Sequence, residues 1–377
     1  MKLIILKDVL KKGVATVEKI SQKVLTLPIL QNILFETEKN FLKLSTTNLE
    51  SGIIWWGLSK TEKEGQICIP TKLFSNFLNF LPQKPIKIET EEMENQIMDL
   101  ECENYKTKIK GFNVEDFPII PQIKDGEFIT IKTEQFCGAL AKIINIPSPS
   151  MTRPEISGIF LQFQNDLIKL VATDSFRLAE EKIFTKNNIL KEYSLILPQT
   201  TAREIVSVFT EKKGDLKIYL SANQIFFEYM MEEVDHPQIQ FTSRLVEGEY
   251  PNYQEIIPKK YGTRLILQKE EFLNQIKTAS FFSGKINEIK MKVEPKNKKI
   301  EIFSQNPDLG EYRSELKGKV EGKELAISFN HRFLVDGINE IKTKELVLEF
   351  TGGEGAAALK PLDEEEYLYI IMPIKAS

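Results

Sequence analysis

Residues 156–163 form a run rich in β-branched and aromatic side chains, in which both faces of a two-residue period are largely apolar. Such a period of two predicts a strand. A polar turn at residues 164–166 separates it from a second apolar run at residues 167–172. Thr173, Asp174 and Ser175 then end this run with short side chains that hydrogen-bond their own backbone and favour a bend. The pattern predicts a β-hairpin closed by a polar bend.

The same pattern occurs twice more in the chain. Residues 27–53 contain two apolar runs, a turn at residues 38–40 and a polar break at Thr46, Thr47, Asn48 and Leu49. Residues 289–316 contain two apolar runs, a turn at residues 296–298 and a polar break at residues 305–308. Three copies of one supersecondary unit indicate three domains of one design.

Helical periodicity supports the same repeat. Apolar residues recur at helical spacing in three opening stretches, residues 6–24, 132–144 and 268–278. A second helical stretch starts 65, 67 and 62 residues after each opening one, at residues 71–81, 199–213 and 330–344. Strand-like segments follow at residues 86–89, 216–220 and 346–350. The predicted unit is therefore helix, strands, helix, strands, used three times.

Size and composition fit this organisation. A chain of 377 residues with 42% hydrophobic and 28% charged residues is typical of a soluble globular protein of two or three domains. No apolar run approaches the roughly 18 residues that a membrane span needs. Residues 3–6 are too short for the core of a signal peptide. We therefore expect a cytoplasmic protein without membrane contact.

Few residues are available for metal or nucleophilic chemistry. Cys68, Cys102 and Cys137 are far apart and form no CxxC pair, and the only histidines are His236 and His331. Neither a disulfide framework, a zinc site nor a histidine-based triad is indicated. We expect no metal and no cofactor.

Charge is distributed unevenly between the predicted helices and the rest of the chain. The six helical stretches together carry +7, whereas the whole chain carries −4. If these helices share a surface, that surface would attract a phosphate backbone without reading base sequence. The alternative is that the lysines only solvate the outer faces of amphipathic helices. The candidate phosphate contacts are Lys7, Lys11, Lys12, Lys23, Lys72, Lys142, Arg153, Arg203, Lys277, Arg332 and Lys342.

Seven segments, in this order and spacing, carry a resemblance to a known family. They are TLPIL at 26–30, DFP at 116–118, VATDSFRLA at 171–179, RLVEGEYPNY at 244–253, QNPDLGE at 305–311, FNHRFLVD at 329–336 and MPI at 372–374. Together they resemble the bacterial sliding clamp, the β subunit of DNA polymerase III.

The resemblance implies an α+β architecture, the DNA-clamp fold. Its three repeated domains would cover residues 1–124, 125–256 and 257–377, each made of two halves that combine a helix with an antiparallel sheet. Two chains would join head to tail into a closed ring whose helices surround double-stranded DNA. Such a protein performs no catalysis: it slides on DNA, is loaded by a clamp loader and tethers the replicative polymerase. It would act in the bacterial cytoplasm, associated with the nucleoid.

The resemblance also implies a hydrophobic cleft that binds short peptides of the polymerase and of other replication and repair proteins. Carried over position by position, the cleft would comprise Ile156, Thr173, Ser175, Phe176, Arg177, Leu178, Pro251, Ile256, Phe333, Ile370, Met372, Pro373 and Ile374. Phe176 stands where the family more often has histidine, and Phe333 where tyrosine is common. The cleft should therefore be less polar than is usual. A Met thioether suits a groove that accepts varied partners.

Two other interpretations remain open at this point. The chain could be a nucleotide-processing enzyme that uses Asp174 together with Asp308 or Glu311. Against this, an aspartate in a Thr-Asp-Ser bend is more simply a turn residue. The chain could also be a structural β-rich repeat protein that makes no contact with nucleic acid.

Overall fold

The structure is a computed structural model that describes residues 1–21, 27–90, 96–122, 126–148, 152–186 and 191–375. Its described residues form two compact units. Unit 1 comprises Met1–Gly138, Asn187–Lys191 and Thr200–Leu245, and unit 2 comprises Ala139–Lys186, Glu192–Gln199 and Val246–Ser377. The boundary runs through the middle repeat because continuous sheets join each half of that repeat to the neighbouring one.

Unit 1 contains two antiparallel sheets. The five-stranded sheet has the order β5 (Lys60–Lys63), β1 (Lys2–Leu6), β7 (Pro85–Thr90), β8 (Ile97–Cys102) and β9 (Tyr105–Lys110). The eight-stranded sheet has the order β10 (Phe128–Lys132), β15 (Asp215–Leu220), β16 (Gln224–Met230), β17 (Pro237–Arg244), β4 (Ser51–Leu58), β3 (Phe41–Thr47), β2 (Asn32–Glu38) and β6 (Gln66–Pro70).

Unit 2 is built in the same way. Its nine-stranded sheet has the order β14 (Tyr193–Pro198), β11 (Gly158–Phe163), β12 (Leu167–Thr173), β13 (Arg177–Phe184), β26 (Tyr367–Ile371), β25 (Ala357–Pro361), β24 (Glu345–Phe350), β18 (Thr263–Gln268) and β22 (Gly318–Gly322). Its four-stranded sheet has the order β21 (Gly310–Leu316), β20 (Lys299–Asn306), β19 (Glu288–Glu294) and β23 (Leu325–Asn330).

All six predicted helices are present. They are α1 (Lys7–Ser21), α2 (Thr71–Phe80), α3 (Thr133–Ile143), α4 (Gln199–Phe209), α5 (Lys269–Ser280) and α6 (His331–Asn339). The predicted end of α1 lies outside the described residues. Of the other five helices, α2, α3, α4 and α6 end before the predicted stretch does, most clearly α6, since β24 begins only six residues after its last residue. Short 3₁₀ turns lie within the loops: η1 (Pro28–Gln31), η2 (Val114–Asp116), η3 (Pro154–Ile156), η4 (Tyr253–Glu255) and η5 (Pro295–Asn297).

The three predicted hairpins are confirmed as three-stranded meanders. They are β2-β3-β4, β11-β12-β13 and β19-β20-β21. The predicted strand start at Ile156 is wrong, because Pro154 opens the 3₁₀ turn η3 there and β11 begins at Gly158. Proline favours the first position of such a turn because its φ is already fixed near the helical value.

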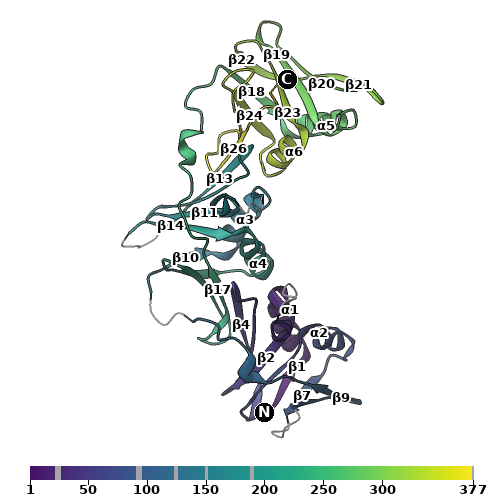
Figure 1. Cartoon of the computed structure of the whole chain (residues 1–377), viewed down its shortest axis with the longest axis vertical. Helices are drawn as coiled ribbons and strands as arrows, with labels where there is room; N and C mark the ends of the chain where they lie inside the picture. The colour runs from purple at the N-terminus through teal and green to yellow at the C-terminus, as the bar shows by residue number, and fades with distance from the viewer. Residues whose placement is uncertain (22–26, 91–95, 123–125, 149–151, 187–190, 376–377) are drawn as a thin grey trace. The chain divides into compact units, whose positions relative to one another are not determined.

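The core of unit 1 depends on a close approach between α1 and β4. Trp55 is buried, and a Cβ atom built on Gly13 of α1 would lie 2.5 Å from its ring. A Cβ atom on Gly57 would lie 2.1 Å from the same ring. Only glycine leaves room for the indole at these two positions. The two helices α1 and α2 pack side by side in this unit (Figure 1).

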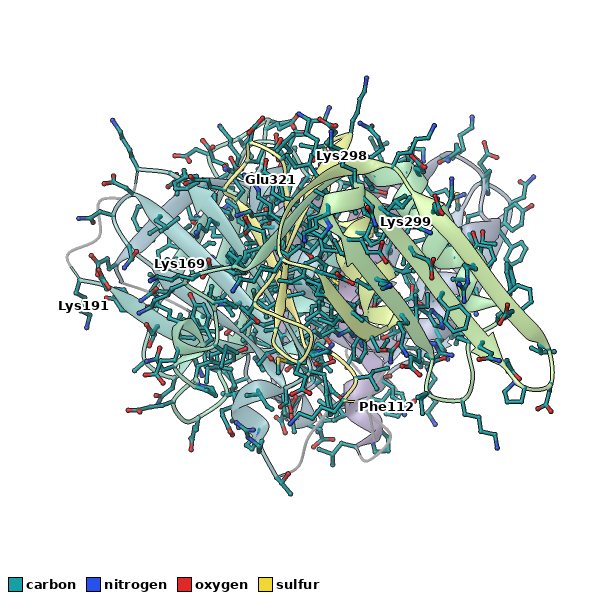
Figure 2. All side chains as sticks on the ribbon, turned by 90° about the horizontal axis from the view of Figure 1, so that it is seen from above. Phe112, Lys169, Lys191, Lys298, Lys299 and Glu321 are labelled. Atoms are coloured by element: carbon teal, nitrogen blue, oxygen red, sulfur yellow. The ribbon has the colours of Figure 1, made fainter. Side chains whose placement is uncertain are left out.

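Charged side chains of both signs are spread over the surface (Figure 2). Lys298 and Lys299 lie on the surface of unit 2 at the turn into β20, and Lys299 is 2.8 Å from Glu315. The three cysteines are buried and free. Within the described residues, none of the helices combines the length and apolarity that crossing a bilayer requires.

Candidate functional site

Residues 173–177 form a tightly fixed bend between β12 and β13. Asp174 Oδ1 accepts hydrogen bonds from the backbone N–H of Phe176 (3.0 Å) and of Arg177 (2.9 Å). Thr173 Oγ1 accepts one from the Ser175 N–H (3.2 Å) and donates one to the Arg177 carbonyl (2.7 Å). Ser175 adopts a positive φ of 76° at the tip. The bend leaves the Phe176 side chain 63% exposed.

Arg177 connects this bend to helix α6. Its Nε donates to Asp174 Oδ2 at 2.9 Å, and its Nη1 donates to Asp336 Oδ2. The guanidinium carbon lies 4.5 Å from the centre of the Phe333 ring. Charge-assisted hydrogen bonds and a cation–π contact together hold the arginine in one place. Arg177 therefore also positions the Phe333 ring.

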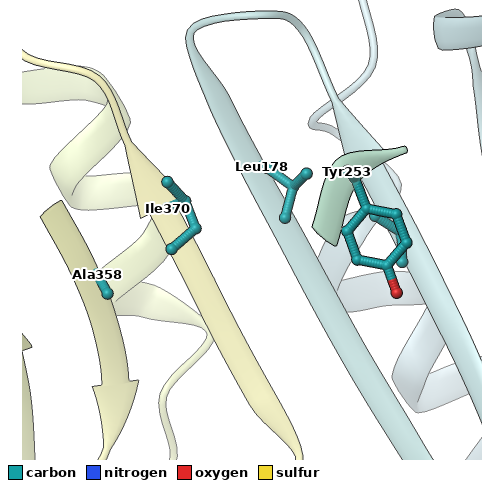
Figure 3. Packing of buried hydrophobic residues seen from close by; sticks show 5 residues of the cluster. Leu178, Tyr253, Ala358 and Ile370 are labelled. Atoms are coloured by element: carbon teal, nitrogen blue, oxygen red, sulfur yellow. The ribbon is translucent and has the colours of Figure 1, made fainter. Parts of the chain in front are cut away.

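The seam between β13 and β26 lies beside this bend. Leu178 is directly opposite Ile370, and both belong to an apolar cluster with Val171, Tyr253 and Ala358 (Figure 3). Beyond the end of β26, the Met372 N–H donates to the Phe176 carbonyl at 2.8 Å. The Met372 side chain is 42% exposed.

The linker before the last repeat packs onto the same cluster through Tyr253. The Tyr253 hydroxyl donates to Glu180 Oε2 at 2.6 Å. Burial, followed by this hydrogen bond, raises the pKa of Tyr253, so the phenol stays protonated and remains a donor. The Pro251 carbonyl accepts from the Tyr253 N–H (2.7 Å), and the Ile256 N–H donates to the Tyr253 carbonyl (3.1 Å). The anchored tyrosine thus fixes the backbone positions of Pro251 and Ile256.

Most of the predicted cleft residues therefore belong to one connected set within unit 2. Three of them present large apolar side chains to solvent: Phe176, Ile256 and Met372. Pro373 and Ile374 follow as half-buried residues, and the Ile374 N–H donates to the Ser328 carbonyl of β23 at 2.8 Å. Ile156 is buried in η3, and none of the contacts above includes it.

Sequence reasoning missed three residues that shape this site, Asp336, Glu180 and Tyr253. Asp336 could have been found, because it lies three residues after Phe333 on a predicted helix and so shares a face with it. Tyr253 lies inside a quoted segment, but its partner Glu180 is 73 residues away in sequence. Only the fold reveals that pair.

The basic residues predicted on helices have different surroundings in the structure. Lys11, Lys12, Lys72 and Arg203 in unit 1 are exposed, as are Lys277, Arg332 and Lys342 in unit 2. Lys7 is only 6% exposed, and its Nζ donates to the Leu81 carbonyl, so it does not offer its charge to a phosphate. Lys23 lies outside the described residues.

Two further basic candidates already have carboxylate partners. Lys142, predicted as a candidate for phosphate contact, has its Nζ 2.5 Å from Glu181 Oε1 and 5.7 Å from the centre of the Tyr367 ring. Arg153 is exposed, and its Nε lies 3.3 Å from Glu155 Oε1.

A basic cluster in unit 1 includes lysines that the sequence did not single out. Lys19 on α1 donates to the Ser207 carbonyl of α4. Burial, followed by the charges of Lys12 and Lys19, lowers the pKa of Lys212. The charges of Lys12 and Lys19 on α1 both act on Lys212, which follows α4, so we call these three residues the α1–α4 basic cluster. This cluster could not be predicted from the sequence, because Lys12 and Lys19 precede Lys212 by about 200 residues and only the fold brings them together.

Asp174 has no free oxygen to serve a reaction. Both of its carboxylate oxygens accept hydrogen bonds within the bend. Among the residues that the structure describes, no group of three or more His, Cys, Asp or Glu side chains could hold a metal ion. The arrangement supports binding by an apolar surface rather than chemistry by acids.

Comparison with known proteins also indicates a binding protein rather than an enzyme, and the matches extend along almost the whole chain. The chain matches the N-terminal, central and C-terminal domains of the DNA polymerase III beta subunit over residues 1–121, 130–252 and 254–375, respectively. The chain belongs to the family of the bacterial sliding clamp. The resemblance drawn from seven segments is therefore confirmed.

Individual relatives agree with this family. The "Beta sliding clamp" of Staphylococcus epidermidis is 26% identical over 359 residues, which cover 93% of each chain. The crystal structure of the DNA polymerase sliding clamp from Bacillus subtilis has a TM-score of 0.93 at 25% identity and full coverage of both chains. A putative DNA polymerase III beta subunit from Eubacterium rectale has a TM-score of 0.92 at 26% identity, again over both full chains.

Family membership decides between the three interpretations. A sliding clamp is a processivity factor and an accessory subunit of a DNA polymerase, not a catalyst. The nucleotide-processing interpretation, centred on Asp174, is therefore wrong. The three-repeat α+β clamp fold is confirmed.

Proposed function

We propose that two copies of this chain join head to tail into a ring around duplex DNA and tether the replicative polymerase there. Enclosure raises the effective concentration of the polymerase at its template, which gives processivity. The three domains would cover residues 1–124, 125–256 and 257–377. The site of action would be the bacterial cytoplasm, on nucleoid DNA, after loading by a clamp loader.

One observation carries this proposal: the pattern of strand pairing between repeats. The third meander strand of the first repeat, β4, pairs antiparallel with β17, the last strand of the second. In the same way β13 pairs with β26, the last strand of the third repeat. By the same rule β21 should pair with a strand equivalent to β17 and β26, and the remaining equivalent is β9.

Both of these strands have an open edge in the described part of the chain. There, β9 pairs only with β8, and β21 pairs only with β20. Such edges attract further strands unless they are covered. A β21 edge that pairs with the β9 edge of a second copy repeats the seam already made twice within each chain. The contact is heterologous, and closure after two copies leaves no edge of this kind open.

The chemistry of the two edges is complementary. Strand β9, YKTKIK, carries three lysines, whereas β21, GEYRSEL, carries two glutamates and one arginine. Phe282 stacks on Tyr312 of β21 at 6.1 Å, and its neighbour Phe281 is 74% exposed. An exposed aromatic residue beside an open edge fits an interface centre.

Retention on DNA tests the ring. The chain is loaded by its clamp loader onto nicked circular plasmid, and the plasmid is then linearised with a restriction enzyme. We expect retention on the circle and release over the ends after cleavage, because phosphate contacts alone are weak for a chain of net charge −4. Equal retention on both forms would disprove encirclement.

We further propose that phosphates of the enclosed duplex contact exposed basic residues of the helices and of the α1–α4 basic cluster. The proposed residues are Lys11, Lys12, Lys19, Lys72, Arg203, Lys212, Lys277, Arg332 and Lys342, with Arg153 and Lys23 as remaining candidates from the sequence. Support comes from the exposure of most of these side chains and from the three lysines of the cluster.

We also propose that the apolar set around the β13–β26 seam is the cleft for partner peptides. The carrying observation is that Phe176, Ile256 and Met372 are exposed apolar side chains on the bend, the linker and the tail, which backbone bonds and the Tyr253 cluster join into one framework. Deletion of residues 372–377 should abolish binding of a labelled polymerase peptide in an anisotropy assay. Size-exclusion chromatography should still detect the dimer. Unchanged affinity would refute the cleft assignment.

A further inference from the structure

The bend at the cleft has a close structural equivalent in unit 1. Residues 47–51 connect β3 to β4 as residues 173–177 connect β12 to β13. Leu49 has a φ of 74°, close to the 76° of Ser175. The same atoms close both bends, since Thr47 Oγ1 bonds the Leu49 N–H and the Ser51 carbonyl, and Asn48 Oδ1 accepts from the N–H groups of Glu50 and Ser51.

The flanking contacts of the two bends also correspond. The Arg244 N–H at the end of β17 donates to the Glu50 carbonyl at 2.9 Å, as Met372 N–H does to the Phe176 carbonyl. Ser51, in the place of Arg177, donates to Glu204 of α4 at 2.7 Å, as Arg177 does to Asp336 of α6. Unit 1 therefore has a second seam, β4–β17, with the same construction as the proposed cleft.

A cavity of about 100 Å³ is present at this second seam. Its walls come from the bend at residues 47–51, from β4 and β17 and from the segment 118–121 that follows η2, and include Leu49, Gly52, Pro118, Ile119, Thr242 and Arg244. Protein cavities of roughly 150 Å³ accept a benzene molecule, so this one is suited to one branched aliphatic side chain. Ile119 is 94% exposed and Leu49 is 46% exposed, which is unusual for two large apolar residues beside one pocket.

Charge distinguishes the second seam from the first. Arg244 stands where the cleft has Met372, and Glu50 stands where it has Phe176. Within the described residues, the Arg244 guanidinium has no carboxylate partner, and the side chain is exposed. An occupant with a carboxylate next to its apolar group would pair with Arg244, whereas a wholly apolar peptide would leave this charge without a partner.

We propose that the β4–β17 cavity is a second peptide-docking site, which takes a short segment of a partner protein carrying a large aliphatic side chain next to an acidic one. The two seams of one chain would then hold two different classes of peptide. A partner bound at one seam would not compete with a partner bound at the other. The two sites are separable by mutation, because residues 372–377 belong only to the cleft.

Disulfide tethering in the full-length protein tests the site. Gln224 lines the cavity and is replaced by cysteine, and the three natural cysteines are buried. The Gln224→Cys protein is equilibrated with 2-mercaptoethanol and one of three probe peptides, Cys-Gly-Leu-Asp, Cys-Gly-Leu-Lys or Cys-Gly-Ser-Asp. Each peptide is supplied as its mixed disulfide with 2-mercaptoethanol, so the thiolate introduced by Gln224→Cys attacks the peptide sulfur and releases 2-mercaptoethanol. Mass spectrometry then measures the tethered fraction. Cys-Gly-Leu-Asp should be tethered about two- to five-fold more than either of the others, the range expected of a solvent-accessible ion pair or a partly buried side chain.

Two matched variants make the result decisive. Adding Arg244→Glu to the Gln224→Cys protein should reverse the preference between the Asp and Lys peptides, while the fluorescence of Trp55 and Trp56 in β4 checks that unit 1 is still folded. In the separate variant Asn297→Cys, the thiol lies at an exposed turn position in unit 2 and should capture all three peptides equally.

Deleting residues 372–377 from the Gln224→Cys protein should leave its preference for Cys-Gly-Leu-Asp intact, because the cleft and the second seam do not share these residues. Equal capture of the three peptides by the Gln224→Cys protein would overturn the proposal. So would a preference that Arg244→Glu does not change, or one that disappears with the deletion.

Discussion

Trp55 occupies the space between α1 and β4 because Gly13 and Gly57 carry no side chain. Replacing Gly13 by alanine would place a methyl group 2.5 Å from the buried indole. Helix propensity alone would favour alanine, but overpacking of a core costs about 1–3 kcal/mol, so we expect net destabilisation. Urea unfolding followed by tryptophan fluorescence measures it.

Gly138 provides the matched control for this prediction. It lies inside α3, and a Cβ atom there would have no neighbour within 4 Å. Gly138→Ala should therefore stabilise the protein by about 0.5–1 kcal/mol. If both alanine variants shifted the unfolding midpoint in the same direction, the packing argument at Gly13 would be incorrect.

Glu181 gives the protein a predictable dependence on pH. Burial raises the pKa of this carboxyl from 4.5 to about 7, although the ammonium group of Lys142 opposes the shift. The folded state therefore binds a proton more tightly than the unfolded state does. The stability that the protonated Glu181 carboxyl contributes is present below pH 4.5 and is lost as pH rises through about 7.

The Glu181→Gln variant should lack this loss. Between about pH 5 and pH 8, its free energy of unfolding should fall less than that of the parent chain, measured by urea denaturation at each pH. Lys142→Met is the informative companion, because removal of the ammonium group should raise the pKa of Glu181 further and extend the loss to higher pH. Parallel pH profiles for all three proteins would contradict the assignment to Glu181.

Lys7 and Lys142 show what the sequence could not predict about single residues. Helical periodicity placed Lys7 and Lys142 correctly on α1 and α3, and their charge made them candidates for phosphate contact. Their availability depends on partners far away in sequence, the Leu81 carbonyl for Lys7 and Glu181 for Lys142. Periodicity identifies the element that carries a side chain, but not what packs against it.

Among the elements, β13 and α6 are joined by Arg177. Replacing Arg177 by methionine keeps a long side chain but removes the bonds to Asp174 and Asp336 and the cation–π contact with Phe333. Loss of this support should let the Phe333 ring move and weaken peptide binding about tenfold, since about 1.4 kcal/mol corresponds to that factor. Fluorescence anisotropy with a labelled polymerase peptide measures the change.

Arg264 on β18 of the same sheet is a suitable control for this test. Its Nε lies 3.4 Å from Glu349 Oε1, so Arg264→Met also removes an ion pair between an arginine and a carboxylate. Neither residue belongs to the bonds described above for the cleft, and we expect the peptide affinity to stay the same. Equal losses in the two variants would mean that loss of an ion pair from this sheet, rather than the Arg177 contact with Phe333, lowers the affinity.

The types of the elements could be predicted from the sequence, whereas some of the residues at which they begin or end could not. The six helices and the hairpin that begins each of the three meanders have strong periodicity, and each was predicted. The third strand of each meander was not. The error at Ile156 arose because this buried residue extends the apolar run of β11 by two positions, although Pro154 sets a different backbone in η3. Alternation records which side chains are buried, and a buried 3₁₀ residue satisfies it as well as a strand residue does.

For the whole molecule, the repeat was visible in the sequence, but the strand that each repeat uses to join the next was not. Equivalent strands such as β17 and β26 share little sequence, because one reads PQIQFTSR and the other YLYII. Their common role is established by antiparallel pairing with β4 and β13. From that pairing the proposed ring contact between β9 and β21 follows, and so does its test.

Charge reversal on the two open edges tests that contact. Lys110→Glu on β9 or Glu311→Lys on β21 alone should raise the dissociation constant of the dimer about two- to five-fold at low salt, because each removes opposite charge from an exposed edge. When one chain carries both changes, every ring contact again joins a reversed β9 to a reversed β21. The double variant should then recover most of the lost affinity in sedimentation equilibrium experiments.

Charge reversal of Glu354, an exposed residue between β24 and β25, serves as a control that should leave the dimer unchanged. Additive losses in the double variant would show that these two strands do not meet across the ring.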